Sequence, residues 1–441
     1  MESQTTQNRL SVEINRIHFI GVGGIGMSAL ARFFLHEKKV VSGSDRALSA
    51  ITAKLTEEGA HIYEGQVAAN ITPDIELVVY TEAMAPTQEE MVAARALGVP
   101  MVNYFEALGA VANPYYLIAV AGAHGKTTTT AMLTDVLEEG GLDPTAIIGS
   151  LRSKTGSNFR PGKSKYAVVE ACEYKRDFLH LKPEILVITN IEHEHVDYYK
   201  DLADVQDAFR TIALSVPETG FIITDTSSPT IKPVLEGVVA TVVDYRKYLD
   251  LMLPLHMPGM HNRLNAAAAR AVAAILGIDD GEAKTALENF AGTWRRFEYK
   301  GTFVNDGGAI PVFDDYGHHP TEVAATIAGA REQYPNRHLT LVFQSHTYSR
   351  TYELFADFVT ALSKADKVVL LPIYAAREEN TYGVTAEQLA EKLVEAGIQT
   401  EVFQTNGGAA EAVRANTPQG GVVLVMGAGT VTEVASLLTT K

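Results

Sequence analysis

The sequence predicts an α/β protein of three domains, each built around a largely parallel sheet. The chain of 441 residues is too long for a single hydrophobic core, so several domains are expected. Short apolar strands alternate with helical stretches along most of the chain, which is the pattern of strands joined by crossover helices. Two glycine-rich turns, near residues 21 and 122, each follow a strand and precede a helix.

Composition and charge exclude several classes of protein. The formal net charge of -16 argues against a broad surface for nucleic acid or for an anionic membrane. Cys172 is the single cysteine, so no intrachain disulfide can form, which fits a reducing compartment. The first ten residues are polar, and no apolar run has membrane-spanning length. We therefore expect a cytoplasmic protein without nucleic-acid or membrane partners.

The first block, residues 1–112, contains the strands "RIHFIGV", "KVVSGSD" and "IELVVYTEA", with the helices "GMSALARFFLHE" and "EEMVAARALG" between them. The turn "GVGGIG" follows the first strand and opens the first helix. Small residues let the backbone approach a diphosphate there, and the helix N-terminus offers unpaired N–H groups. Asp45 ends the next strand, where a nicotinamide enzyme has its ribose-binding acid. This block alone is compatible with a dehydrogenase.

The second block, residues 113–298, follows a linker at "VANPYYL" and carries "GAHGKTTTT" between a strand and a helix. Val120 stands where a strict P-loop has its first glycine, so this loop is a shortened variant. Its backbone N–H groups can still cradle phosphates. Lys126 can reach the β- and γ-phosphate oxygens, and the Thr127 hydroxyl can hold Mg²⁺.

Acidic and histidine side chains follow the later strands of this block. Glu170 ends the apolar strand "YAVVE", and His195 lies just after "VITNIE". In a parallel sheet both residues fall at the same edge as the P-loop, and a carboxylate there suits Mg²⁺. A histidine ligand equally favours Mn²⁺, or acts through water. We interpret the neighbouring groups as solvated surface side chains: Glu173, His193, Glu194 and Asp197.

The third block, residues 299–441, contains further buried-type strands that end in polar or glycine-rich residues. They are "AIPVFDDYGHHPTEV", "HLTLVFQSHTYSR", "ADKVVLLPIY" and "GGVVLVMGAG". Functional groups of open α/β sheets gather at such strand ends. A hydride-transfer enzyme has no use for a triphosphate loop, whereas a kinase or ligase with a nucleotide-linked substrate needs both phosphate sites. A noncatalytic, nucleotide-gated binding module stays open as a further alternative.

Eight motifs occur in the order found in the Mur ligases, and together they resemble that family over about residues 14 to 435. The motifs are "GVGGIGMSALA", "AGAHGKTTTT", "VVEACE", "TNIEHEHVD", "PGMHNRLNAAAA", "RRFE", "DDYGHHPTEV" and "FQSHTYSRT". The resemblance implies an N-terminal Rossmann-like domain for a UDP-sugar, a central P-loop ATPase domain and a C-terminal Rossmann-like domain. It is closest to members that use ATP to phosphorylate the lactyl carboxylate of UDP-N-acetylmuramate.

In those members the acyl phosphate is attacked by L-alanine, and the products are an amide, ADP and phosphate. The resemblance therefore implies ATP, Mg²⁺ or Mn²⁺, UDP-N-acetylmuramate and L-alanine as cofactors and substrates of a monomer or homodimer. The alternative is the recycling ligase, which attaches a preformed murein tripeptide to the same sugar. The "DDYGHHP" motif favours the alanine enzyme.

The resemblance also implies roles for individual residues. The UDP-sugar would be held by Gly23, Gly24, Ile25, Gly26, Ser44, Asp45 and Thr81. ATP would be held by Gly122, Ala123, His124, Gly125, Lys126, Thr127, Thr128, Asn262, Asn265, Arg296 and Asp315. The metal would be bound by Thr127, Glu170 and His195, with Lys126 and Asn190 beside the reacting groups. L-Alanine would be surrounded by Tyr316, His346 and Arg350.

Overall fold

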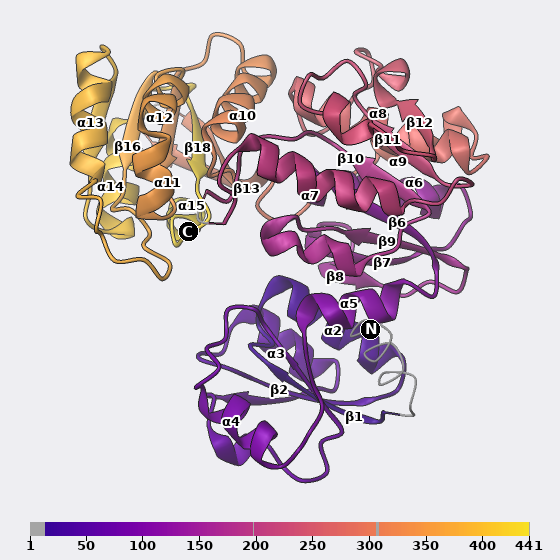
Figure 1. The fold of residues 1–441 in the computed structure, drawn as a ribbon. Helices are drawn as coiled ribbons and strands as arrows, with labels where there is room; N and C mark the ends of the chain where they lie inside the picture. Colours follow the sequence, from indigo (N-terminus) through magenta and orange to yellow (C-terminus); the bar gives the residue numbers. More distant parts are fainter. Residues whose placement is uncertain (1–13, 197, 306–307, 441) are drawn as a thin grey trace. The chain divides into compact units, whose positions relative to one another are not determined.

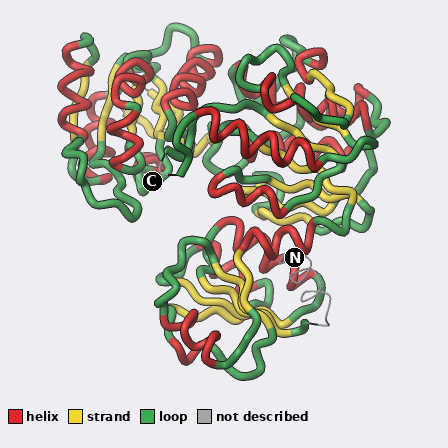
Figure 2. Tube along the Cα trace, in the orientation of Figure 1, coloured by secondary structure: helices red, strands yellow, loops and turns green. Residues whose placement is uncertain are grey.

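The computed structural model describes residues 14–196, 198–305 and 308–440, which form three sheets covered by helices (Figures 1 and 2). By its contacts the chain forms two compact units. The first unit comprises residues 1–194, 201–249 and 265–290, and contains the first two sheets. The second unit comprises residues 195–200, 250–264 and 291–441, and contains the third sheet.

The first sheet has five parallel strands in the order β3-β2-β1-β4-β5. Its strands are β1 (Arg16–Ile20), β2 (Val40–Asp45), β3 (His61–Glu64), β4 (Leu77–Tyr80) and β5 (Met101–Asn103). Its helices are α2 (Ile25–His36), α3 (Ala50–Glu57), α4 (Glu89–Ala96) and α5 (Tyr104–Ala112). The order of strands reverses at β1, which lies between β2 and β4. A crevice for a ligand forms at such a switch point, outside the carboxyl ends of the strands.

The second sheet has seven strands in the order β12-β11-β10-β6-β9-β7-β8. They are β6 (Tyr116–Ala121), β7 (Thr145–Arg152), β8 (Ser157–Arg160), β9 (Tyr166–Glu170), β10 (Ile185–Ile188), β11 (Phe221–Thr224) and β12 (Thr241–Asp244). The helices of this part of the chain are α6 (Lys126–Glu139), α7 (Leu202–Ser215), α8 (Met260–Ile275) and α9 (Asp280–Glu288). β6 lies between β9 and β10 and runs parallel to both, so the carboxyl ends of these three strands share one edge.

The third sheet has six strands in the order β13-β14-β18-β15-β16-β17. They are β13 (Glu298–Asn305), β14 (Gly308–Asp315), β15 (Leu339–Phe343), β16 (Lys367–Leu370), β17 (Gln399–Val402) and β18 (Val422–Met426). Its helices are α10 (Pro320–Gln333), α11 (Tyr348–Glu353), α12 (Phe355–Leu362), α13 (Ala386–Glu395), α14 (Asn406–Asn416) and α15 (Thr432–Thr439). Alternate residues of β18 belong to two apolar clusters, so both faces of the sheet are buried, as a parallel sheet requires.

The predicted alternation of strands and helices is confirmed in all three blocks. Two antiparallel pairs, β7 with β8 and β13 with β14, were absent from the prediction and extend otherwise parallel sheets. The predicted linker is shorter than "VANPYYL", because α5 continues to Ala112 and β6 starts at Tyr116. Among the described residues, no helix combines the length and the hydropathy needed to cross a membrane.

Candidate functional site

The first glycine-rich turn is held in shape by the end of strand β2. The N–H groups of Gly21 and Val22 both donate to the carbonyl of Ser44, at 2.8 and 3.0 Å. The N–H group of Gly23 donates to the Asp45 carboxylate at 2.8 Å, and a Cβ on Gly23 would lie 2.7 Å from that oxygen. The turn therefore has no room for side chains on its inner side, and its backbone is left to face a ligand.

Helix α2 begins beyond this turn with its N-terminus open. Gly24 is the N-cap residue and supplies no side-chain cap, so the first N–H groups of the helix can bind an anion. The carbonyl of Ile25 accepts a hydrogen bond from the Asn158 side chain of β8. Gly26 packs against the ring of Tyr104. These contacts fix the predicted diphosphate turn between the first and the second sheet.

Thr81 and Ser44 approach the turn in different ways. The Thr81 methyl group would lie 2.8 Å from a Cβ on Gly21, so this side chain lies against the turn. The Ser44 side chain is fully buried, and its hydroxyl donates to Glu90 at 2.6 Å. Ser44 therefore touches the turn through its carbonyl, and its hydroxyl belongs to the core of the first sheet.

The second glycine-rich turn, between β6 and α6, accepts only glycine at two positions. Gly122 has φ +137°, and a Cβ there would lie 2.0 Å from the Thr189 hydroxyl. Gly125 has φ +83° at the N-cap of α6, where a Cβ would lie 2.5 Å from the Asn265 side-chain oxygen. Asn265 thus lies directly against the phosphate loop.

Asn190, at the end of β10, clamps this loop from the neighbouring strand. Its carbonyl accepts the N–H of Ala123 at 3.1 Å, and its side-chain oxygen accepts the N–H of His124 at 2.9 Å. Its side-chain amide donates to the His124 carbonyl at 3.0 Å, and the Thr189 hydroxyl donates to the same carbonyl at 2.6 Å. In this structure Asn190 therefore shapes the phosphate loop.

Lys126 is engaged by its own loop and by a buried carboxylate. Its ammonium donates to the carbonyls of Gly122 and Ala123, and lies 2.9 Å from the Glu173 carboxylate. Burial disfavours the charged ammonium, but Glu173 and Glu170 outweigh it, so the pKa of Lys126 lies above its ordinary value.

The assignment of Glu173 and Glu194 to the solvated surface is wrong, because their side chains are 1% and 7% exposed. Glu173 faces the phosphate loop, where Lys126 compensates its charge. His193 is half-buried, and Asp197 lies outside the described residues.

Thr127 and Glu170 form a pair of oxygen ligands at the start of α6. The Thr127 hydroxyl donates to the Glu170 carboxylate at 3.0 Å, and the second carboxylate oxygen accepts the N–H of Gly149 at 2.9 Å. A Cβ on Gly149 would lie 2.2 Å from that oxygen, so the position is reserved for glycine. A hydroxyl beside a carboxylate provides the hard oxygen ligands that Mg²⁺ prefers. Thr128, the next residue of α6, is buried.

His195 and Asn262 are among the predicted site residues that belong to the second unit. His195 has φ +55°, and its carbonyl accepts the N–H groups of Tyr198 and Tyr199. Asn262 is buried near the start of α8, and its amide donates to the Pro258 carbonyl at 2.9 Å.

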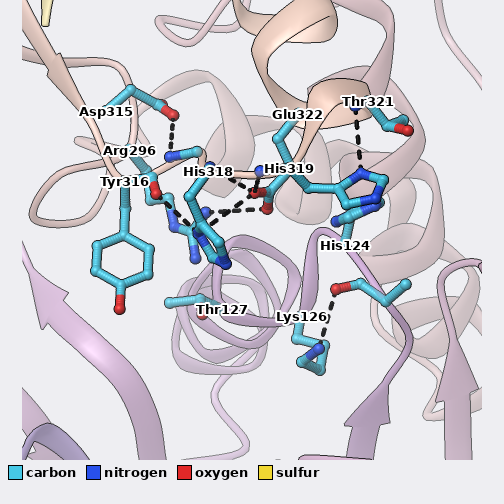
Figure 3. A network of polar contacts seen from close by, with 12 residues as sticks. His124, Lys126, Thr127, Arg296, Asp315, Tyr316, His318, His319, Thr321 and Glu322 are labelled. Atoms are coloured by element: carbon cyan, nitrogen blue, oxygen red, sulfur yellow. Dashed lines mark hydrogen bonds and ion pairs between the residues drawn. The ribbon is translucent and has the colours of Figure 1, made fainter. Parts of the chain in front are cut away.

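In the second unit, Asp315 organises the loop at the carboxyl end of β14. Its carboxylate accepts the N–H groups of Phe297 and Gly317, each at 2.8 Å (Figure 3). Burial raises the pKa of Asp315 to about 6, against the opposing effect of Arg296. The Arg296 guanidinium lies over the Tyr316 ring at 5.3 Å, so both predicted residues share one surface.

Four aromatic rings lie in a row beside this surface, and they come from the ends of three strands. Tyr316 contacts His318 at 5.4 Å between ring centroids, His318 contacts His346 at 5.6 Å, and His346 stacks on Tyr374 at 5.6 Å. Arg350 reaches His346 at 3.3 Å. The structure therefore brings Tyr316, His346 and Arg350 together. His318 and Tyr374 were not among the predicted site residues, although both lie in the strand-end motifs "AIPVFDDYGHHPTEV" and "ADKVVLLPIY".

Comparison with known proteins identifies the family of this chain. The Mur ligase family catalytic domain matches residues 16–116, the Mur ligase middle domain matches residues 120–246, and the Mur ligase glutamate ligase domain matches residues 295–429. A UDP-N-acetylmuramate–L-alanine ligase of Agathobacter rectalis is 39% identical over 96% of this chain and 98% of its own length. The chain belongs to the Mur ligase family.

Further relatives and solved structures agree with this family and its fold. The enzyme of the same name from Aquifex aeolicus is 39% identical over 96% of this chain and 97% of its own length. The crystal structure of a UDP-N-acetylmuramate–alanine ligase from Thermotoga maritima has a TM-score of 0.81 at 28% identity, covering 96% of this Mur ligase and 98% of that chain. A murein peptide ligase from Psychrobacter arcticus has a TM-score of 0.69 at 24% identity, covering 96% of this chain and 98% of its own, and shares the fold.

Proposed function

We propose that this Mur ligase uses ATP to join L-alanine to the lactyl carboxylate of UDP-N-acetylmuramate, giving UDP-N-acetylmuramoyl-L-alanine, ADP and phosphate. The observation that carries the proposal is the 39% identity to L-alanine ligases over 96% of the chain, across all three matched domains. A dehydrogenase is excluded as the function, because the second glycine-rich turn belongs to a ligase domain.

The first chemical step is activation of the lactyl carboxylate. A carboxylate is a poor electrophile, and transfer of the ATP γ-phosphoryl group to one of its oxygens creates a leaving group. The glycine turn at α2 binds the diphosphate of the UDP-sugar, while Lys126 neutralises the β- and γ-phosphates of ATP. Thr127 and Glu170, with His195, would hold Mg²⁺, which supplies charge neutralisation when bound.

The second step is attack of the L-alanine amine on the acyl phosphate. Arg350 offers a fork of donors for the amino-acid carboxylate, and its contact with His346 orients it. Tyr316 lies in the same row of rings and would close the pocket around the small side chain. Asn262 and Asn265 are proposed for the adenine, Arg296 for an ATP phosphate and Asp315 for the ATP ribose.

We place the domain boundaries at residues 1–112 for the UDP-sugar domain, 113–298 for the ATP domain and 299–441 for the amino-acid domain. Because ATP and UDP-linked sugars are cytoplasmic metabolites, we propose that the enzyme works in the cytoplasm.

A phosphate-release assay tests the function and separates it from tripeptide recycling. The purified enzyme is incubated with ATP, Mg²⁺ and UDP-N-acetylmuramate, with either L-alanine or L-Ala-γ-D-Glu-meso-diaminopimelate added. We expect phosphate release that depends on L-alanine and a product whose mass is larger by one alanine residue. Release that depends on the tripeptide and not on L-alanine would instead assign the recycling reaction.

A further inference from the structure

Tyr104 packs against the diphosphate turn, and the proposed function gives it no role. It is the first residue of α5, and its backbone position is fixed by the capping box of that helix. The Asn103 side chain accepts the N–H of Glu106 at 2.8 Å, and the Glu106 carboxylate accepts the N–H of Asn103 at 2.8 Å. The start of the helix that carries the phenol is therefore fixed.

On one side the phenol lies against the diphosphate turn. A Cβ on Gly26 would lie 2.7 Å from Cζ of Tyr104 and 2.8 Å from its hydroxyl oxygen. Gly26 has an ordinary helical position, so the phenol explains why this residue of the turn is glycine. The hydroxyl consequently lies beside the first turn of α2, where the N-terminus of that helix is open.

The phenol also lies within electrostatic reach of Glu170, the metal-site carboxylate. Burial raises the pKa of Tyr104 above its ordinary value, and the charge of Glu170 raises it further. The phenol therefore remains protonated at all physiological pH values and can only act as a neutral donor or acceptor. Glu170 is the same carboxylate that accepts the Thr127 hydroxyl.

The hydroxyl of Tyr104 makes no hydrogen bond to any residue that the structure describes. The Tyr104 side chain is partly exposed, so this hydroxyl is open to solvent or to a ligand. A phenol that lies against Gly26 at the diphosphate turn, with its hydroxyl open, can thus donate to an acceptor that the ligand brings.

We propose that Tyr104 is a substrate-contacting residue whose hydroxyl donates a hydrogen bond to the lactyl carboxylate of the UDP-linked sugar. The inference rests on the proposed function. The diphosphate occupies the turn at α2 and the transferred phosphoryl group lies near Glu170, so the substrate group between them is the carboxylate. The phenol keeps its proton throughout and orients the attacking carboxylate oxygen toward the γ-phosphate.

The test compares Tyr104→Phe with wild type in two measurements. Calorimetric binding without ATP gives the affinity for UDP-N-acetylmuramate, and for UDP-N-acetylglucosamine, which lacks the lactyl group. Steady-state kinetics gives kcat/KM for each substrate. We expect Tyr104→Phe to lose roughly 10- to 100-fold in affinity and in kcat/KM for UDP-N-acetylmuramate, the range for a hydrogen bond to a charged group. The affinity for UDP-N-acetylglucosamine and the KM values for ATP and L-alanine should stay within about three-fold of wild type, because none of these ligands carries the lactyl carboxylate.

Tyr116→Phe is the matched control, because Tyr116 starts β6 at the end opposite the phosphate loop. It should match wild type in every measurement. The proposal would be overturned if Tyr104→Phe kept its affinity and kcat/KM for UDP-N-acetylmuramate within about two-fold of wild type. It would also be overturned if the variant lost affinity for both UDP-sugars equally. A wild-type enzyme that binds UDP-N-acetylmuramate but does not ligate L-alanine would refute the proposed function. The binding comparison would then still decide the contact made by Tyr104.

Discussion

The Lys126 ammonium of the phosphate loop is paired with the buried Glu173 carboxylate at 2.9 Å. Two of its three N–H donors also serve the carbonyls of Gly122 and Ala123, so the donors of the ammonium are all engaged. A nucleotide phosphate therefore has to replace a partner of Lys126. The carboxylate is the partner to be replaced, because it is an anion like the phosphate, whereas the two carbonyls belong to the loop itself.

Glu173→Gln should destabilise the ligand-free enzyme and strengthen the response to ATP. The change leaves a buried ammonium without its counter-charge, which costs about 3 kcal/mol of unfolding free energy. Bound ATP supplies that charge again, so the rise in Tm at saturating ATP should be larger than in wild type. Urea unfolding and thermal scans, with and without ATP, measure both effects. Glu218→Gln, an exposed control, should change neither.

Equal ATP-induced shifts in Tm for wild type and Glu173→Gln would show that the carboxylate does not compete with the nucleotide. In that case Glu173 would remain beside Lys126 in the ATP complex.

Lys126→Ala should slow ligation severely. The proposed role of the ammonium is to neutralise charge on the β- and γ-phosphates as the phosphoryl group is transferred, and the loss of such a donor costs about 10²- to 10³-fold in kcat. Alanine-dependent phosphate release measures this rate. Lys154→Ala changes a lysine that is half exposed on the β7–β8 hairpin and should keep wild-type activity. Near-normal turnover by Lys126→Ala would remove the residue from the mechanism.

The sequence was sufficient to predict the two phosphate turns, because glycine at a strand-to-helix turn has few other uses. Gly122 and Gly125 indeed have positive φ and no room for a Cβ. It was not sufficient to predict where single polar side chains point. Ser44 lies near the end of β2, and Glu173 follows the end of β9. Both are buried because of their tertiary partners, Glu90 and Lys126, which are distant in sequence.

The amino-acid surface shows the same limit. Tyr316 and His346 were expected from motifs, but the row of rings includes His318 and Tyr374, which come from two different strand ends. A single sequence carries no signal that these strands end at the same edge of one sheet. The β7–β8 pair was missed for a related reason, because its antiparallel pairing depends on a turn within an otherwise parallel pattern.

Ser44→Ala should affect stability more than binding of the UDP-sugar. The hydroxyl donates to the buried Glu90, and leaving that carboxylate short of a donor costs about 1 to 3 kcal/mol of unfolding free energy. The Ser44 carbonyl, which accepts two N–H groups of the turn, is unchanged. Asp45→Ala removes the acceptor of Gly23 and should raise the KM for the UDP-sugar instead. The two variants are compared by urea unfolding and by steady-state kinetics.

A large rise in the KM for UDP-N-acetylmuramate in Ser44→Ala, without loss of stability, would contradict the buried orientation of this hydroxyl. The kinetic and unfolding measurements therefore separate a contact with uridine from a contact with the core.

Arg350→Ala should raise the KM for L-alanine by about 10-fold or more, because the guanidinium is proposed to bind the ground-state carboxylate of the amino acid. The KM values for ATP and UDP-N-acetylmuramate should stay within about two-fold, since neither is assigned to this residue. Arg331→Ala, a partly exposed arginine of α10, serves as the control. An unchanged KM for L-alanine would exclude Arg350 from the amino-acid site.

Asp177→Asn should stabilise the enzyme above neutral pH and leave its stability unchanged in acid. Burial raises the pKa of Asp177 to about 7, and Glu82 acts in the same direction. One carboxylate oxygen, Oδ2, has no hydrogen-bond partner among the residues that the structure describes. The folded protein therefore binds a proton that the unfolded chain releases near pH 4.

The stabilising effect of that proton is complete below about pH 4 and is lost as the pH rises through about 7. The asparagine variant has no such loss, so its advantage in unfolding free energy should grow from zero near pH 4 to about 2 to 4 kcal/mol at pH 8. Urea unfolding at pH 4.5, 6 and 8 measures this difference, with Asp357→Asn as an exposed control. A difference that is constant with pH would show that Asp177 ionises normally in the folded enzyme, and that its environment is more polar than the burial of its side chain indicates.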